Sequence, residues 1–165
     1  MLEIAIDSDG EWDSSTSWDK LAQSAASAAI AESAFPQLGS GERAVELSVR
    51  LGTDAEVHAL NAEWRGKDKP TNVLSFPMAE PEDFVVSAGP ALMLGDIILA
   101  RGVCAAEAEE KAIALEDHAA HLLVHGTLHL LGYDHMDEGA AADMEAREVR
   151  ALARMGIADP YEGRG

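Results

Sequence analysis

The sequence predicts a single α+β domain, residues 1–165, in which a mixed sheet of about four strands is covered by helices. Two stretches in the first third alternate apolar and polar residues with the period of two that is typical of half-buried strands. A nearly continuous apolar run at 94–100 is typical of an interior strand. A later segment is apolar on all sides from Ala119 onward, which indicates a helix in the middle of the domain.

The first part of the chain contains two predicted strands, each followed by a helix. The first predicted strand has large apolar side chains at alternate positions, Leu2, Ile4 and Ile6, separated by Glu3, Ala5 and Asp7. The Ala-rich segment 18–35 predicts a helix. Residues 45–51 are the clearest strand, and Thr53-Asp-Ala-Glu56 matches a capping box that begins a helix extending to about residue 64. A right-handed crossover is expected to make the two strands parallel.

The rest of the chain is predicted to supply two strands and two helices. A turn at 66–70 precedes a short buried strand at 72–76. Val85 and Val86 in the loop 77–90 are candidates to dock as an edge strand or as a lid, which the sequence leaves open. The interior strand at 94–100 follows. One long helix is predicted at 105–131 and an amphipathic helix at 138–155, and the tail 157–165 is expected to be loose.

The composition indicates an ordered cytoplasmic protein. Apolar residues make up 47% of the chain, too many for a disordered one. The single cysteine, Cys104, cannot form an internal disulfide, which suits a reducing compartment. The N-terminus lacks the basic region of a secretory signal, and no apolar stretch reaches the ~18 residues of a membrane span. We therefore expect no membrane partner.

The strongest functional signal is a group of histidines near the end of the long predicted helix. His125 and His129 are four residues apart, so on an α-helix they lie on one face, one turn apart. Gly132 is suited to end the helix, and the next two residues turn the chain so that His135 comes back. Three neutral imidazoles that leave a fourth position open for water match a catalytic zinc site. The sequence therefore predicts one Zn²⁺ per chain, on the central buried helix.

A purely structural role is the alternative for histidines on an apolar helix. Five of the six histidines lie within 18 residues, however, and burying all of them without a ligand would leave many nitrogens unpaired. His121 competes as a ligand because it stands four residues before His125. The set 121, 125 and 129 spans roughly 12 Å of helix, too far for one ion, and the turn at Gly132 favours the pair nearer His135.

The residue at 126 separates this pattern from a protease motif. The histidine spacing is that of the metzincin metalloproteases, in which a Glu after the first His is the general base for the metal-bound water. Here that position is Gly126. The sequence therefore predicts the metal site without the protease chemistry.

Three blocks of the sequence resemble the YbeY family of bacterial rRNA-maturation metalloendoribonucleases. The most specific is His125-Gly-Thr-Leu-His-Leu-Leu-Gly-Tyr-Asp-His135. The other two are Arg65-Gly-Lys-Asp-Lys-Pro-Thr-Asn-Val-Leu-Ser-Phe-Pro77 and Leu94-Gly-Asp-Ile-Ile-Leu99. The blocks stand in the family's order, and the resemblance covers about residues 2–155.

The resemblance implies a zinc-dependent, single-strand-specific endoribonuclease that acts in rRNA processing, at the 3′ end of 16S rRNA, and in ribosome quality control. The family's metal ligands match His125, His129 and His135, and Arg65 matches an arginine implicated in its activity. Single-stranded RNA, the ribosome or its small subunit, and ribosome-biogenesis proteins are the implied partners, and DNA is not. The family fold has a mixed sheet with a cleft at the metal.

The net charge is the main objection to an RNA substrate. A formal charge of −18 opposes binding to a polyanion. Arg65, Lys67 and Lys69, which we call the basic strip, nevertheless place three of the 12 basic residues within five positions. Composition alone favours ordinary solvated charges, whereas the resemblance favours a strip that contacts phosphate.

The expected reaction is cleavage of an RNA phosphodiester at the metal, with Arg65 and His125 as catalytic residues. Zinc lowers the pKa of a bound water and polarises a phosphoryl oxygen. Arg65 would clamp the phosphate, and Lys67 and Lys69 would add affinity. The base is left open among Asp134, Asp96, a second water and the RNA 2′-hydroxyl as internal nucleophile. Both aspartates are also candidates to orient a ligand histidine by hydrogen bonding.

Two other functions fit part of the pattern. One is a zinc peptidase, which lacks its usual base at Gly126. The other is a ribosome-associated factor that binds RNA or protein and whose metal only stabilises the fold. Structural zinc sites usually have four protein ligands, often including Cys, but Cys104 lies 21 residues before His125. The number of protein ligands therefore separates an enzyme from a binding factor.

Overall fold

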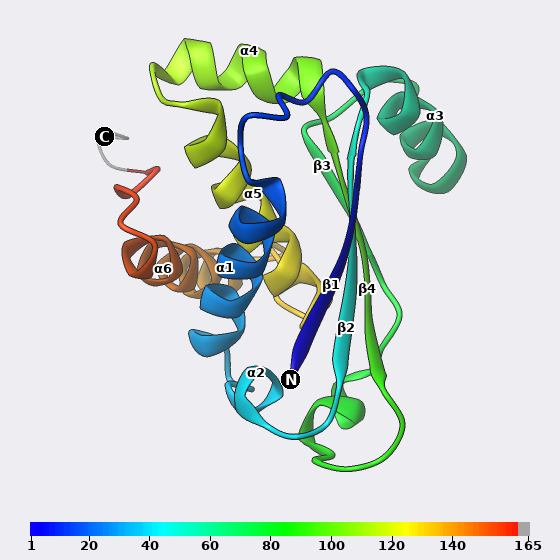
Figure 1. Cartoon of the computed structure of the whole chain (residues 1–165), viewed down its shortest axis with the longest axis vertical. Helices are drawn as coiled ribbons and strands as arrows, with labels where there is room; N and C mark the ends of the chain where they lie inside the picture. The colour runs from blue at the N-terminus through cyan, green and yellow to red at the C-terminus, as the bar shows by residue number, and fades with distance from the viewer. Residues whose placement is uncertain (162–165) are drawn as a thin grey trace.

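The computed structural model describes residues 1–161, which form a four-stranded sheet with helices on both sides (Figure 1). The strand order is β1-β2-β4-β3, with β1, β2 and β4 parallel and β3 antiparallel at one edge. The predicted single α+β domain with a mixed sheet is confirmed. The strands are β1 (Leu2–Ser8), β2 (Val45–Gly52), β3 (Val73–Pro77) and β4 (Leu92–Ala100), and the helices are α1 (Trp18–Ala31), α2 (Gln37–Ser40), α3 (Asp54–Arg65), the 3₁₀ helix η1 (Pro81–Val85), α4 (Arg101–Lys111), α5 (Leu115–Leu130) and α6 (Glu138–Arg154).

β1 and β2 form the predicted parallel pair, in a register that runs from Leu2 opposite Val45 to Ser8 opposite Leu51. The helix between them, α1, packs on β1 and along α5, and its buried alanines let the helices approach closely. α1 ends at Ala31, earlier than the predicted residue 35. The hydroxyl of Ser33 donates to the carbonyl of Ile30 and accepts the N–H of Phe35, so it replaces helical hydrogen bonds at this point.

A bulge in β4 decides which side chains face the helices. Pairing with β2 runs from Glu46 opposite Met93 to Leu47 opposite Gly95, so Leu94 is the extra residue. Gly95 has φ 145°, and a Cβ there would lie 2.3 Å from the carbonyl oxygen of Phe76. Only glycine fits this position. Beyond the bulge, Ile97 and Leu99 face the helices and are buried.

α3 lies on the opposite side of the sheet from α1, α5 and α6 (Figure 1). The hydroxyl of Thr53 accepts the N–H of Glu56 as predicted, but the Glu56 side chain pairs with Arg50, so only half of the capping box forms. α3 and the sheet enclose a small separate core in which Val57 packs with residues of β3 and β4. The sheet therefore has a main core on one face and a minor core on the other.

The single long helix predicted at 105–131 is wrong, because the chain forms two helices. α4 ends at Lys111, and Ala112 adopts a left-handed conformation with φ 56°. The N–H of Ile113 returns to the carbonyl of Ala108, as at other left-handed helix ends. α4 also starts earlier than expected, because the Asp54 carboxylate accepts the N–H groups of residues 102 and 103. A cap from a residue about 48 positions away leaves no local sequence signal.

α5 is the central helix of the domain. It packs on β3 and β4 and against α1, α4 and α6. Most of its side chains are buried from His118 onward, so the predicted helix that is apolar on all sides is confirmed in its C-terminal part. A rigid element surrounded by packed neighbours holds its side chains in fixed positions.

The loop between β3 and β4 docks through a different residue from those predicted. Phe84 in η1 is buried and its ring lies 5.0 Å from that of Phe35, whereas Val85 and Val86 are exposed. Neither valine forms an edge strand. The sequence did not indicate that Phe84 is buried. A 3₁₀ helix this short buries one side chain and therefore leaves no periodic pattern of apolar residues.

The C-terminal part is more ordered than expected. α6 matches the predicted helix, and Asp137 caps it by accepting the N–H of Ala140. The expected loose tail is wrong for residues 157–161, because Ile157 packs on the core and Tyr161 forms hydrogen bonds with Glu148 and His121. Residues 162–165 lie outside the described part. Within residues 1–161, no helix is both long enough and apolar enough to cross a membrane.

Candidate metal centre and substrate cleft

Three histidines converge where α5 ends, as the sequence predicts. One ligand nitrogen from each of His125, His129 and His135 lies within 4.8 Å of the others. The N–H of Gly132 closes on the carbonyl of His129, and Gly132 itself has φ 99°. A glycine at that backbone angle turns the chain sharply, which brings His135 over the last turn of α5.

The donor set suits a zinc ion. Tetrahedral zinc with bonds of about 2.1 Å separates its nitrogens by roughly 3.4 Å, so small side-chain rotations from the observed spacing suffice. Burial, and then the nearby His125 and His135, lower the pKa of His129 to about 4. His129 is therefore neutral near pH 7, which is the form that binds a metal.

Glu148 lies behind the histidines, and the sequence analysis missed it. Its side chain is fully buried, and Oε2 accepts a hydrogen bond from Nδ1 of His125 at 3.1 Å. Burial raises the pKa of Glu148, but hydrogen bonds from His121, His125 and Tyr161 outweigh that effect and hold the pKa below its usual range. A carboxylate here fixes the His125 proton on Nδ1 and leaves Nε2 for a metal.

A signal for Glu148 does exist in the sequence. Met144, Glu148 and Leu152 stand four residues apart and are all fully buried on the inward face of α6. An acidic residue on an otherwise apolar helix stripe needs a buried partner. That partner is supplied by α5, which the sequence alone does not place beside α6.

The histidines further up α5 have other partners. Nε2 of His121 bonds Oε1 of Glu148 at 2.7 Å, so His121 belongs to the support of the site and not to the three-histidine cluster. Nε2 of His118 bonds Glu107 at 2.8 Å, and burial lowers the pKa of His118. Spacing alone does not exclude His121 as a metal ligand, but in the structure His121 bonds Glu148 and lies outside the three-histidine cluster.

Gly126 packs directly against the sheet. A Cβ at this position would lie 3.0–3.3 Å from three side-chain atoms of Ile97, and Ile97 is itself buried in β4. A larger side chain would point at the sheet and not at the histidines. A glutamate at this position, as in a metalloprotease, would press on Ile97, which would have to shift by a few tenths of an ångström.

The basic strip and the histidines line the same cleft. A cavity of about 480 Å³ is bordered by all three strip residues, by β3, and by His125 and His129. The loop that carries the strip is tied to α3 through Asn61, which is buried. The Asn61 side chain donates to the carbonyl of Lys69 at 2.8 Å, and its backbone carbonyl accepts the N–H of Lys67 at 3.1 Å.

Within residues 1–161, the side chains of the basic strip form no ion pair, in contrast to several arginines elsewhere. Arg65, Lys67 and Lys69 are all exposed. Other arginines are engaged: Arg50 pairs with Asp7 and Glu56, and Glu32 pairs with both Arg150 and Arg154. Unpaired cations beside a histidine cluster can receive a phosphate without first breaking an ion pair.

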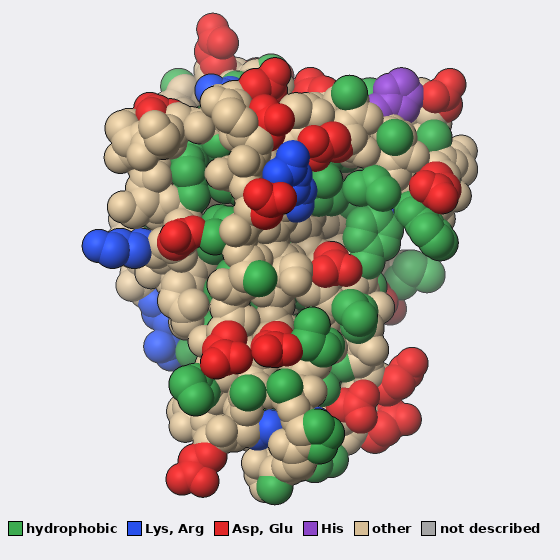
Figure 2. All heavy atoms as spheres, turned by 45° about the vertical axis from the view of Figure 1, so that its right-hand side comes forward, with side chains coloured by type: hydrophobic (Ala, Val, Ile, Leu, Met, Phe, Trp, Pro, Cys, Tyr) green, Lys and Arg blue, Asp and Glu red, His purple; other side chains and the backbone are tan. Residues whose placement is uncertain are grey.

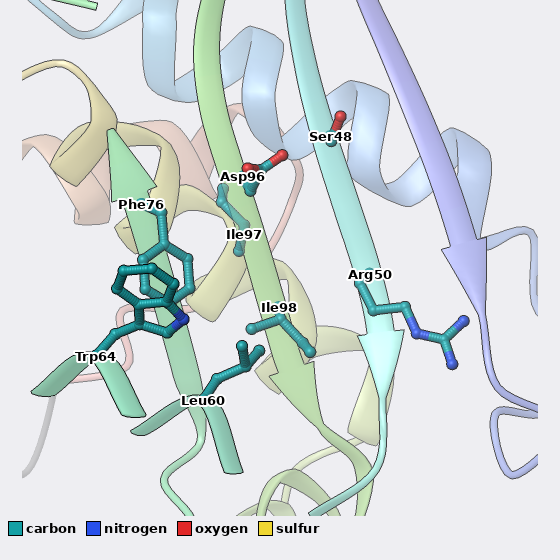
Figure 3. A pocket seen from close by; sticks show the side chains of 8 residues that line it. All are labelled: Ser48, Arg50, Leu60, Trp64, Phe76, Asp96, Ile97 and Ile98. Atoms are coloured by element: carbon teal, nitrogen blue, oxygen red, sulfur yellow. The ribbon is translucent and has the colours of Figure 1, made fainter. Parts of the chain in front are cut away.

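Asp96 does not lie at the site, which corrects the prediction that it orients a histidine or acts as the base. Figure 3 shows Asp96 on β4 beside Ser48 of β2 and Phe76 of β3, in a largely apolar pocket of about 560 Å³ on the α3 side of the sheet. Leu94 faces α5, so unbroken alternation would turn Asp96 inward as well. The bulge shifts this parity and turns Asp96 outward.

Asp134 supports the loop that carries His135. Its carboxylate accepts the N–H of Met136 at 3.0 Å, and in residues 1–161 no hydrogen bond joins it to His125, His129 or His135. Its expected role in orienting a ligand histidine through a hydrogen bond is therefore not seen, although its charge is close enough to His129 to favour protonation of that ring.

The face of the sheet that carries α3 is rich in acidic side chains. Figure 2 looks onto the α3 side of the sheet and shows many acidic side chains but few from Lys or Arg. A polyanion is repelled over such a surface and attracted at a local group of cations. The net charge of −18 is therefore compatible with phosphate binding at the cleft alone.

Comparisons with known proteins cover nearly the whole chain. A family model described as endoribonuclease YbeY matches residues 7–156. Relatives named endoribonuclease YbeY include one from Sphingopyxis alaskensis, 50% identical over 98% of each chain, and one from Novosphingobium aromaticivorans, 51% identical over 96% of this chain and 95% of its own. A solution structure of a Thermotoga maritima protein has a similar fold, with a TM-score of 0.56 and 23% identity over 93% of this chain and 92% of that one. The chain belongs to the endoribonuclease YbeY family.

Proposed function

We propose that this protein is a zinc-dependent, single-strand-specific endoribonuclease that matures the 3′ end of 16S rRNA in the cytoplasm and takes part in ribosome quality control. The observation that carries the proposal is the cleft in which the basic strip, without an ion pair in residues 1–161, lies beside His125 and His129 of the three-histidine cluster. The family name of the relatives supports RNA as the substrate. Ribosomes, their small subunit and biogenesis proteins are the partners proposed with it.

His125, His129 and His135 would hold one zinc ion per chain. Bound there, zinc would supply a Lewis acid and an activated water near neutral pH. The chain's own contribution is to keep His129 neutral through burial and to orient the ring of His125 through its bond to Glu148. Three protein ligands leave a position open, which fits a catalytic site better than a structural one.

Arg65 would bind the scissile phosphate and offset the negative charge that develops there. Its planar guanidinium can contact two phosphate oxygens, whereas Lys67 and Lys69 act as point charges on neighbouring phosphates. The proposed substrate is an unpaired strand, because a flexible single-stranded backbone enters a narrow cleft more easily than a duplex does.

The residues that line the cleft reduce the number of candidates for the general base and the nucleophile. Of the residues 1–161 that border it, none is acidic. We therefore favour attack by a water molecule or by the RNA 2′-hydroxyl, without Asp134 as the general base. The products separate the two, because attack by the 2′-hydroxyl leaves a 2′,3′-cyclic phosphate and fails on a substrate with a single 2′-deoxynucleotide at the cleavage position.

The two rival functions are less well supported. A zinc peptidase needs an acidic base close to the metal, and Gly126, which packs tightly on Ile97, supplies none. A binding factor with a structural metal would be expected to provide a fourth protein ligand, whereas Cys104 is buried and hydrogen-bonds to the carbonyl of Asn72. Cleavage of unstructured protein by the zinc-loaded chain would revive the first rival.

Cleavage of a single-stranded RNA that carries the immature 3′ end of 16S rRNA tests the proposal. The protein is compared metal-stripped, zinc-reloaded, and zinc-reloaded as Arg65→Ala. Because Arg65 would act on the transition state, we expect kcat to fall by about 100-fold or more in the variant, and stripping to abolish cleavage. Lys20→Ala, an exposed lysine on α1, is the matched control and should cleave normally.

Failure of all three forms to cleave, with one zinc bound per chain, would favour a binding factor. Cleavage by the metal-stripped protein would show that zinc is not needed. If the Arg65→Ala variant then cleaved equally well, a contaminating nuclease would be responsible.

A further inference from the structure

The carboxylate of Glu148 joins three donors in the middle of the domain. Oε1 accepts hydrogen bonds from Nε2 of His121 at 2.7 Å and from the hydroxyl of Tyr161 at 2.6 Å. Oε2 accepts from Nδ1 of His125 at 3.1 Å. We call these four residues the Glu148 network. It connects α5, α6 and the segment after α6 to one metal-ligand candidate.

We propose that Glu148 is a positioning residue of the metal centre, and that Tyr161 and His121 hold its carboxylate in the orientation that aims Nε2 of His125 at the metal. The proposal rests on the metal centre of the proposed function. It assigns a function to the segment after α6, which the sequence predicts to be a loose tail.

Burial explains why the three donors are needed. Glu148 is 0% exposed and lies between Met144 and Leu152, which are also 0% exposed. A carboxylate in such surroundings is costly unless hydrogen bonds replace its lost water. A leucine of similar volume at this position would pack without that cost, so stability alone does not account for a glutamate.

The arrangement of the donors fixes the carboxylate in rotation as well as in place. With only His125 as a partner, the group could turn about its last bond and offer either oxygen. Because His121 and Tyr161 both occupy Oε1, the other oxygen is directed at His125. His121 stands one helical turn before His125 on α5, so two successive turns of that helix are anchored to the same group.

Another histidine of α5 also has a carboxylate partner but lies outside the metal centre. Nε2 of His118, near the start of α5, bonds Glu107 of α4 at 2.8 Å. His118 is not a member of the three-histidine cluster. Loss of the Glu107 carboxylate should therefore affect stability without affecting metal binding, which separates a structural role from a positioning role.

The test uses the full chain as Glu148→Gln, Tyr161→Phe and Glu107→Gln. Zinc affinity is measured by competition with a chromophoric chelator, the visible spectrum is recorded after loading with Co²⁺, and urea unfolding is followed on the metal-free proteins. Loss of such supporting contacts typically weakens metal binding by about 10- to 100-fold, which we expect for Glu148→Gln. We expect a weakening of about threefold to tenfold for Tyr161→Phe, since one of three donors is lost.

The Co²⁺ spectrum supplies a readout that a merely structural role would not change. Glu148→Gln should shift the visible bands or reduce their intensity, because the ring of His125 is no longer held. Glu107→Gln should keep both the spectrum and the zinc affinity of the wild type, even if its metal-free form unfolds at lower urea concentration.

Wild-type zinc affinity in both Glu148→Gln and Tyr161→Phe would overturn the positioning role and leave the metal centre intact. Absence of zinc binding by the wild type would overturn the metal centre and the positioning role together. If Glu148→Gln does not fold, the zinc affinity of Tyr161→Phe tests the proposal. That variant keeps the Glu148 carboxylate and the aromatic ring at position 161, and it loses only the hydroxyl. Equal weakening in Glu107→Gln would show a general effect of stability and would also overturn the proposal.

Discussion

At the scale of single residues, burial decides which groups are chemically active. The pKa of the Cys104 thiol is raised to about 12, chiefly by burial and further by the charge of Glu107. A raised thiol pKa leaves very little thiolate at any pH well below 12. The cysteine is therefore unreactive in the folded protein, in contrast to the exposed basic strip.

We predict that Cys104 reacts with a thiol reagent such as DTNB only when the protein unfolds. At pH 8, labelling of the folded protein should be more than roughly 100-fold slower than labelling in denaturant. The measurement compares the two rates on the metal-stripped chain, so that zinc neither shields the thiol nor stabilises the fold. Rapid labelling of the folded form would show that the structure around Cys104 opens readily.

The sequence predicts those residues of the candidate site that lie close together along the chain. His125, His129 and His135 lie within 11 positions, and one helix period and one glycine suffice to bring them together. Glu148 was missed because it lies on another helix. Asp96 was placed wrongly because a bulge, which depends on how β2 and β4 pair, reverses the side on which its side chain lies.

At the scale of elements, the periodicity of apolar residues predicts what depends on local sequence, but not what depends on packing between distant segments. Four strands and the helices α3 and α6 follow from their patterns of apolar residues. The break between α4 and α5 does not, because Lys111-Ala-Ile-Ala114 contains neither Gly nor Pro. That break depends on where α4 and α5 each pack, and Ala112 adopts a left-handed conformation as a consequence.

We predict that Ala112→Gly stabilises the protein. Alanine at φ 56° carries strain that glycine does not, and the gain of about 1 kcal/mol is partly offset by the greater freedom of glycine in the unfolded chain. Urea unfolding of the metal-free protein measures the change. Ala106→Gly, at an exposed position inside α4, is the control and should lose about 1 kcal/mol. Destabilisation by both variants would show that the left-handed residue is not strained.

At the scale of the whole molecule, the net charge is strongly acidic, whereas the basic strip gathers three cations beside the histidines. The acidic surface of Figure 2 and the net charge of −18 disfavour RNA elsewhere on the protein. The cleft with the basic strip is the exception. RNA affinity should therefore depend on few cations, and its dependence on salt should be correspondingly shallow.

We predict a slope of about −2 for the logarithm of the RNA association constant against the logarithm of salt concentration, because three phosphates of a single strand would be neutralised. Lys67→Ala and Lys69→Ala should each reduce the magnitude of the slope by about 0.7, whereas Lys20→Ala on α1 should leave it unchanged. Binding to the metal-stripped protein, which avoids cleavage, can be followed by the fluorescence of Trp64. Trp64 is 66% exposed and precedes Arg65, whereas Trp12 and Trp18 are 3% and 7% exposed. A steeper slope, or one that Lys20→Ala reduces as much as Lys67→Ala, would mean that RNA also binds outside the cleft.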